Sequence, residues 1–223
     1  ALMLIGYSMP SPSRANSPMV VTLQLRQLAV PPGQRLLVRN LDWPEFENIL
    51  TELGEHRASR IAYSQGILEI RMPTPEHEVD KELIGYIVKT LLDELEIDCE
   101  CFGSTTFKQE AMNSGIEPDQ CCYIQNRARG KRRLDLSIDP PPDLAIEIDV
   151  TSKTQIDAYT SLGVPELWVY TQNQLKIYTL KSGQYESVTI SPTFPKLPIL
   201  DWITDVLVQS ANLGRSPALR AFR

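Results

Sequence analysis

The sequence lacks several features that would assign it to a class directly. No apolar run approaches the roughly 18 residues of a membrane-spanning helix, so we expect no transmembrane segment. The opening ALMLIGYSMPSPSRANSPM has no basic segment before its short apolar patch and no small-residue cleavage site, which favours a cytoplasmic location. An excess of basic residues is also absent. The net charge of −6 argues against wholesale coating of nucleic acid but permits a local basic patch.

Cysteine is scarce, and its spacing is not that of a typical metal site. Cys99 and Cys101 are separated by one residue, and Cys121 and Cys122 are adjacent. Structural zinc sites favour CxxC-type spacing, whereas both pairs here fall in strand-like segments, where cysteine usually acts as a small apolar side chain. We interpret the four as core residues, with a structural metal cluster as an alternative.

The composition is that of a globular protein, with 42% hydrophobic and 22% charged residues in 223. Residues 1–35, rich in Ser, Pro and Gln, are expected to form a flexible N-terminal arm that Pro31-Pro32-Gly33 terminates. Residues 36–210 are expected to form a single domain, and residues 211–223 a C-terminal tail.

Hydrophobic periodicity predicts four helices. They cover residues 43–54, 75–96, 154–162 and 201–209. Asp42 caps the first helix and Gly54 ends it, and Gly163 ends the third. The helix over 75–96 has the clearest apolar stripe, formed by Val79, Leu83, Ile84, Ile87, Val88, Leu91, Leu92 and Leu95. Glu76, His77 and Asp80 point along this stripe. They either line a cleft or are exposed first-turn residues favoured by the helix dipole.

Alternating patterns predict strands between these helices. They are the hairpin RIAYSQGILEIRMP, residues 97–102, 104–108, 117–124 and 143–150, the hairpin formed by PELWVYT and QLKIYTL, and YESVTIS. This order predicts an α/β fold with one mixed sheet flanked by helices. Within it, LGVPELWVY is interpreted as structural, with Leu167, Trp168 and Val169 in the core.

The strand in PPPDLAIEIDVTSKT carries carboxylates where a buried strand should be apolar. Alternation places Asp143, Glu147 and Asp149 on one face and an apolar core surface on the other. Because an unpaired buried carboxylate is costly, something must compensate these groups. Asp143 lies about 13 Å from Glu147 along the strand, too far to share one ion.

A second carboxylate, Asp119, follows Pro118 at the start of a strand expected to neighbour 143–150. Mg²⁺ prefers oxygen ligands, often one or two carboxylates with water. We therefore expect Asp119, Glu147 and the backbone carbonyl of Ile148 to bind Mg²⁺ or, in its place, Mn²⁺, and no organic cofactor is indicated.

Seven blocks spread over roughly residues 30 to 200 carry a family resemblance. They are PPGQRLLVRNLDWPEFENIL, RIAYSQGILEIRMPTPEHE, GSTTFK, GIEPDQCCYI, PPPDLAIEIDVTSKT, YTSLGVPELWVY and LKIYTLKSGQY. Together they resemble the Uma-two family of putative restriction endonucleases, within the PD-(D/E)XK nuclease superfamily. The resemblance implies a restriction-endonuclease-like core, a mixed β-sheet flanked by helices, with an extra N-terminal helix and strands.

The resemblance also implies roles for individual residues. Asp119 takes the place of the motif's first aspartate and Glu147 that of its second acidic residue. His77, with Glu76, falls at the polar start of the first core helix.

The family's lysine is missing from both of its usual positions. Asp149 stands at the lysine position on the strand, and Gln155 stands four residues before Tyr159, where the family's displaced lysine lies. Gln155 would orient water but carries no charge. Lys153 is the candidate replacement, and the alternative for it is a solvated surface residue.

A basic run precedes this strand. Arg127, Arg129, Lys131, Arg132 and Arg133 either bind a phosphate backbone or form a solvated loop. No aromatic residues interleave with them, so stacking on single-stranded bases is not indicated.

The sequence therefore predicts a Mg²⁺-dependent endonuclease that hydrolyses phosphodiester bonds in DNA. A homodimer is compatible with this activity, because double-strand cleavage needs two centres. The alternative is a catalytically degenerate module that keeps the nuclease fold and binds nucleic acid or a protein partner, which the missing lysine favours.

Overall fold

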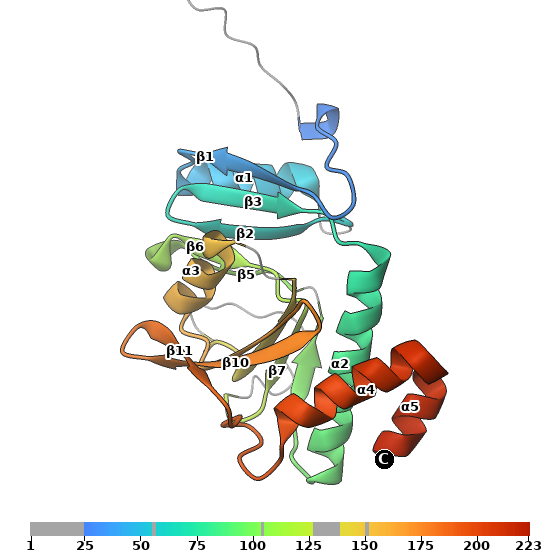
Figure 1. Ribbon diagram of the computed structural model, residues 1–223. Helices are drawn as coiled ribbons and strands as arrows, with labels where there is room; N and C mark the ends of the chain where they lie inside the picture. Colours follow the sequence, from blue (N-terminus) through green and yellow to red (C-terminus); the bar gives the residue numbers. More distant parts are fainter. Residues whose placement is uncertain (1–24, 55–56, 104, 127–138, 150–151) are drawn as a thin grey trace, which may run out of the picture.

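The computed structural model describes residues 25–54, 57–103, 105–126, 139–149 and 152–223 of the chain (Figure 1). It has the expected α/β architecture, but its strands form two sheets, where the sequence predicted one. The first sheet has five strands in the order β1-β3-β2-β6-β5, and the second has six in the order β11-β10-β9-β8-β7-β4.

The first sheet is antiparallel and carries the extra N-terminal elements. Its strands are β1 (Arg35–Arg39), β2 (Arg60–Ser64), β3 (Ile67–Arg71), β5 (Phe107–Gln109) and β6 (Ser114–Ile116). Helix α1 (Trp43–Leu53) covers its outer face, where Phe46 stacks on Tyr63 with ring centroids 4.2 Å apart. Asp42 caps α1 through a capping box with Glu45, which satisfies free N–H groups of the first turn. Strands β1 and β6 were not predicted.

The second sheet is mixed. Its strands are β4 (Glu100–Phe102), β7 (Gln120–Tyr123), β8 (Leu144–Ile148), β9 (Glu166–Thr171), β10 (Gln174–Lys181) and β11 (Gln184–Val188). Among the strands that the structure describes, β8 and β9 alone run parallel, and helix α3 (Lys153–Leu162) connects them, as a parallel pair requires. Gly163 ends α3 with φ of 75°, a conformation that glycine adopts readily.

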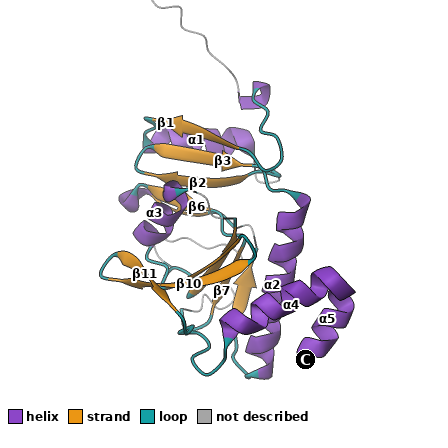
Figure 2. Cartoon of the chain, in the orientation of Figure 1, coloured by secondary structure: helices purple, strands orange, loops and turns teal. Residues whose placement is uncertain are grey.

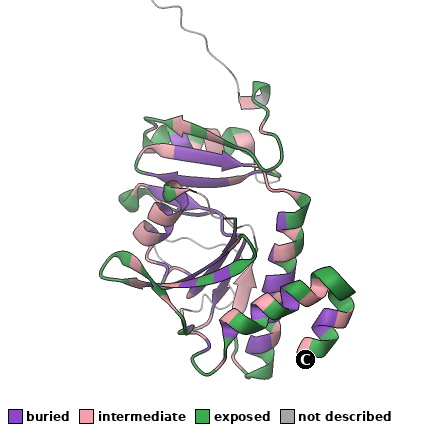
Figure 3. Cartoon of the chain, in the orientation of Figure 1, coloured by how far each residue is buried: buried purple, intermediate pink, exposed green. Residues whose placement is uncertain are grey.

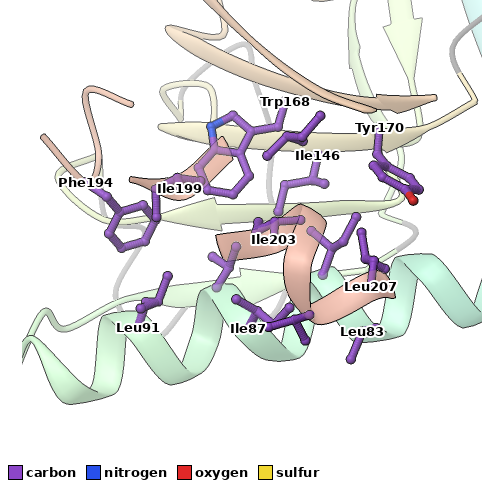
Figure 4. Close-up of a cluster of buried hydrophobic side chains, with 14 of the residues drawn as sticks. Leu83, Ile87, Leu91, Ile146, Trp168, Tyr170, Phe194, Ile199, Ile203 and Leu207 are labelled. Carbon is purple, nitrogen blue, oxygen red and sulfur yellow. The ribbon is translucent and has the colours of Figure 1, made fainter. Parts of the chain in front are cut away.

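The main core lies between one face of this sheet and three helices. These are α2 (Pro75–Glu94), α4 (Ile199–Leu213) and α5 (Arg215–Phe222), and α4 crosses α2 (Figure 1). Figure 4 shows Leu83 and Ile87 of α2 and Ile203 of α4 meeting Ile146 of β8 and Trp168 of β9. The structural interpretation of Trp168 agrees with its complete burial.

Two features of the helices differ from the sequence prediction. Val79 and Leu95 were assigned to the apolar stripe of α2, but they are 60% and 45% exposed. Residues expected to form a C-terminal tail instead form α5, whose Ala218 and Leu219 pack into the main core. The stripe is shorter than predicted, because the buried apolar side chains of α2 run only from Leu83 to Leu92.

Helix α3 lies between the two sheets (Figure 2). Its Ala158, Tyr159 and Leu162 pack with residues of both sheets, including Ala62 of β2 and Ala145 of β8. Strands β2 and β3 are accordingly buried along nearly their whole length (Figure 3). The inner face of the first sheet therefore faces the second sheet, and side chains on β3 can reach β8.

Two short 3₁₀ helices, η1 (Leu25–Gln27) and η2 (Glu110–Met112), complete the described elements. None of the helices in the described ranges combines the length and hydrophobicity needed to cross a membrane. Most of the expected N-terminal arm, residues 1–24, lies outside the described residues.

Candidate active site

Asp119 and Glu147 lie side by side in the second sheet. Strand β7 pairs antiparallel with β8, with Gln120 opposite Ile146, so Asp119, the residue before β7, meets the end of β8. The Ile148 N–H donates to Asp119 Oδ2 at 2.9 Å. Both carboxylates are completely buried. The expected adjacency of these two strands is therefore confirmed.

Arg71, the last residue of β3, enters this site from the first sheet. Its guanidinium donates to the Ile148 carbonyl at 2.9 Å and to Glu147 Oε2 at 3.2 Å, and its Nη2 lies 3.7 Å from Asp119 Oδ1. These are the three groups that the sequence suggested as metal ligands. Arg71 is 9% exposed.

Arg71 was not among the predicted site residues, although the sequence contains a signal for it. In ILEIR, alternation places Leu68 and Ile70 on one face and Glu69 and Arg71 on the other. The apolar pair packs against α1 with the core of the first sheet. This strand lies within RIAYSQGILEIRMPTPEHE, one of the blocks that carry the family resemblance. Two charged residues on its inward face indicate that they have polar partners within the fold.

His77 lies on the other side of Asp119. Its Nε2 is 3.0 Å from Asp119 Oδ1, and the side chain is 3% exposed. The two atoms are as close as in a hydrogen bond, but they are not aligned as a hydrogen bond requires. Neither His77 Nε2 nor Asp119 Oδ1 has a hydrogen-bond partner among the described residues. The hydroxyl of Thr74 caps α2 by accepting from the His77 N–H, which fixes the start of the helix at the site.

Glu76, in contrast, is exposed in the first turn of α2. Hydrogen bonds from its own N–H and from Thr74 lower the pKa of Glu76. The structure therefore separates the two neighbours: His77 lines the site, whereas Glu76 is a first-turn carboxylate of the kind that the helix dipole favours.

Tyr159 of α3 contacts the other carboxylate. Its buried hydroxyl donates to Glu147 Oε1. Burial, and next the charge of Glu147, raise the pKa of Tyr159 well above its ordinary value, so the phenol stays protonated and remains a donor. In the sequence, Tyr159 only marked the lysine position four residues before it; in the structure it contacts a carboxylate of the site.

The centre holds more negative than positive charge. Asp119 and Glu147 are both buried, and Arg71 is the cation that contacts both. Burial, and then the charge of Asp119, raise the pKa of Glu147 well above its ordinary value. Burial also acts to raise the pKa of Asp119, but His77, Arg71 and the Ile148 N–H outweigh it and lower that pKa. Two buried carboxylates that share one guanidinium favour the binding of a proton or of a further cation.

The three residues considered at the lysine positions lie in different environments. Strand β8 ends at Ile148, and Asp149 is exposed with a left-handed φ of 56°, so the predicted alternation stops before Asp149. Gln155 is 3% exposed, and its Oε1 accepts from the Ser152 hydroxyl at 3.3 Å. Lys153 is exposed at the first position of α3.

Asp143 has a structural role at the other end of β8. Its Oδ2 accepts from the backbone N–H groups of Ile124, Gln125 and Asn126 at 2.6, 2.9 and 2.9 Å. These bonds hold the end of β7 and replace a shared ion as compensation for its charge. The predicted basic run of Arg127, Arg129, Lys131, Arg132 and Arg133 lies outside the described residues.

The cysteines do not form the alternative metal cluster in the described part of the chain. Cys101 and Cys122, cross-strand partners on β4 and β7, form a disulfide, and Cys99 and Cys121 are free. No three His, Cys, Asp or Glu side chains come together as a metal-binding group among the described residues. The donor set at Asp119 is instead two carboxylates and one backbone carbonyl.

Comparison with known proteins identifies a family and a shared fold. Residues 43–207 match the family described as "Uma2: Putative restriction endonuclease", and no curated protein matches the chain. A solved structure, a putative nuclease belonging to DUF820 from Anabaena variabilis ATCC 29413, superposes with a TM-score of 0.52 at 18% identity. The match covers 73% of this chain and 99% of that one, and it shows the shared fold. The family match includes β7, β8, α2 and α3, which carry Asp119, Glu147, His77 and Tyr159, and on this match the chain belongs to the Uma2 family of putative restriction endonucleases.

Proposed function

We propose that this protein is a Mg²⁺-dependent endonuclease that hydrolyses phosphodiester bonds in DNA. The observation that carries the proposal is the convergence of Asp119 and Glu147, both fully buried, with the Ile148 carbonyl on one cation position. Burying two carboxylates together is costly unless a cation compensates them. Membership of a restriction endonuclease family supports a nuclease reading of this site.

The residues present fit a hard divalent cation. Asp119 Oδ1 is buried without a hydrogen-bond partner among the described residues, and it faces the same space as Glu147 Oε2 and the Ile148 carbonyl. Mg²⁺ prefers oxygen ligands and keeps several waters, so two carboxylates and one carbonyl suffice as its protein ligands. When bound, it would activate water and neutralise the charge that develops on the phosphate.

The surrounding side chains position these ligands. The Tyr159 hydroxyl holds Glu147 Oε1, which leaves Oε2 directed toward the cation position. The Ile148 N–H holds Asp119 Oδ2 in the same way, and Oδ1 faces the cation position. His77 Nε2, buried 3.0 Å from that atom, is placed to hold or move a proton there. Gln155 and Lys153, on the first turn of α3, are candidates for orienting the water.

A row of arginines supports a polyanionic substrate. Arg35 of β1, Arg71 of β3 and Arg60 of β2 are cross-strand partners, and like charges in such positions oppose one another. Glu69 lies 3.8 Å from Arg35 and Glu78 lies 3.7 Å from Arg60. The row runs from a 40% exposed Arg35 side chain to the buried Arg71, a path along which phosphate groups would approach the carboxylates.

The test is cleavage of supercoiled plasmid DNA with Mg²⁺ or Mn²⁺. We expect Asp119→Ala and Glu147→Ala each to lower the rate by about 100-fold or more, the scale for removing a group that stabilises transition-state charge. The control is Glu186→Ala, which removes an exposed carboxylate paired with Lys181. Cleavage by Glu147→Ala at the unsubstituted rate would show that the site is wrong.

One observation favours a second candidate function, a nuclease fold that binds nucleic acid without cleaving it. The Arg71 guanidinium itself lies at the cation position, and neither Asp149 nor Gln155 supplies the motif's lysine. Tight plasmid binding without cleavage in Mg²⁺ and in Mn²⁺ would favour this candidate.

A further inference from the structure

The centre lacks a lysine at both motif positions but already contains a buried cation. The residues at those positions, Asp149 and Gln155, carry no positive charge. Arg71 comes from a different strand and sheet, yet its guanidinium reaches both carboxylates and the Ile148 carbonyl. The positive charge that the motif places on β8 or α3 is thus supplied here from β3.

The contacts of Arg71 are those of an ion at this site. Its Nη1 bonds the carbonyl, and its Nη2 bonds Glu147 and lies 3.7 Å from Asp119, so the two nitrogens cover all three oxygen groups. Arginine cannot lose its charge in a protein, so this compensation does not depend on a proton. The same planar fork is well suited to phosphate oxygens.

Its position on the sheet distinguishes Arg71 from its neighbours. Arg60, directly across on β2, lies 3.7 Å from Glu78 of α2, away from the two site carboxylates. Nε of Arg71, like that of Arg60, has no hydrogen-bond partner among the described residues, so the hydrogen bonds of Arg71 are made by its terminal nitrogens. A side chain held only at its tip can exchange those partners without breaking other bonds.

We propose, resting on the function proposed above, that Arg71 is the cationic catalytic residue of this centre and that it competes with the divalent metal for the oxygens of Asp119, Glu147 and Ile148. In the metal-free chain its guanidinium keeps the two carboxylates together. With a divalent metal held by those oxygens, the Arg71 guanidinium would contact the scissile phosphate and stabilise the charge developing there.

The test measures metal binding and cleavage separately in Arg71→Gln. Mn²⁺ binding is followed without DNA by the loss of the free-ion electron paramagnetic resonance signal. We expect Arg71→Gln to bind Mn²⁺ at least tenfold more tightly, because a competing charge is removed from its ligands. At saturating Mn²⁺ we expect its rate of plasmid cleavage to fall at least 100-fold. Lys108→Gln, the control, removes a half-exposed cation that pairs with Glu47 away from the site. It should leave the Mn²⁺ affinity within about twofold, because Lys108 does not contact the ligands.

Arg71→Lys covers the outcome that Arg71→Gln fails to fold, which circular dichroism would reveal. Lysine keeps the charge but loses the fork, so we expect an intermediate Mn²⁺ affinity and a rate above that of Arg71→Gln. Unchanged or weaker Mn²⁺ binding by the folded variants would overturn the proposal. An unchanged or higher rate of plasmid cleavage by these variants at saturating Mn²⁺ would also overturn it. Arg71 would then only compete with the metal and would not take part in cleavage.

These outcomes separate the proposal from the function on which it rests. If the unsubstituted chain binds Mn²⁺ and cleaves DNA while Arg71→Gln does both equally well, the role of Arg71 is wrong and the nuclease function stands. If neither protein binds Mn²⁺ or cleaves, the proposed function fails, and the role of Arg71 fails with it.

Discussion

Glu166 offers a sharp test of the structural interpretation of LGVPELWVY. It lies at the start of β9, is 2% exposed, and accepts four hydrogen bonds. Its Oε1 accepts from the Trp168 indole and the Ser191 hydroxyl, each at 2.6 Å. Its Oε2 accepts from the Thr193 N–H at 2.9 Å and from the Thr193 hydroxyl at 2.6 Å. These bonds join the segment after β11 to the sheet.

The substitution Glu166→Gln preserves the volume and removes one acceptor. If the remaining oxygen faces the indole, the new amide NH₂ faces the Thr193 N–H, and two donors then oppose each other without access to water. Hydroxyl groups can rotate, but an N–H cannot. One charge-assisted hydrogen bond is lost and one buried N–H is left without an acceptor. Together these changes lower the free energy of unfolding by about 3 kcal/mol. For a chain of this length that lowers the melting temperature by about 6–12 °C.

Urea unfolding followed by circular dichroism measures the change in the free energy of unfolding. The control is Glu186→Gln on β11, the same substitution at a carboxylate that is 58% exposed and pairs with Lys181. We expect that control to stay within about 0.5 kcal/mol of the unsubstituted protein. A change for Glu166→Gln within about 0.5 kcal/mol of the control would refute the reasoning.

The structure also predicts that Glu166→Gln leaves the active site intact. Glu166 pairs with Leu144 at the start of β8, and Ile148 lies four residues further along, about 13 Å away. Mn²⁺ affinity should therefore be unchanged in the folded variant. If Glu166→Gln lost Mn²⁺ binding but kept its stability, LGVPELWVY would belong to the metal site and its structural interpretation would be wrong.

Three further predictions concern single groups. Asp143→Ala should lower the free energy of unfolding by about 2 kcal/mol without changing Mn²⁺ affinity, because three N–H groups lose their acceptor while the site is untouched; a loss of Mn²⁺ binding would contradict this. Tyr159→Phe should cost about 2 kcal/mol in urea unfolding, because Glu147 loses a buried donor, and an unchanged stability would argue against that bond. Burial raises the pKa of Cys121 to about 12, so iodoacetamide at about pH 8 should modify the partly exposed Cys99 and spare Cys121 until denaturant is added, as read by peptide mass spectrometry; labelling of Cys121 in the native protein would count against its burial.

Much of the local structure follows from the sequence because its signals are local. The cap at Asp42, the glycine that ends α3 and the alternation in β8 each depend on neighbouring residues, and each appears in the structure. The adjacency of Asp119 and Glu147 followed from motif order and strand pairing. Family membership was also evident, because many ordered blocks carried the resemblance.

The partners of those carboxylates were decided only by the tertiary structure. Arg71 and Tyr159 reach Glu147 because the inner face of the first sheet and helix α3 both pack toward β8, and no local pattern encodes that packing. The division of the strands into two sheets has the same origin. Sequence alone thus determined the two acids and their strands, whereas the fold chose the buried cation between them, because only packing can bring a distant charge to compensate carboxylates that water does not reach.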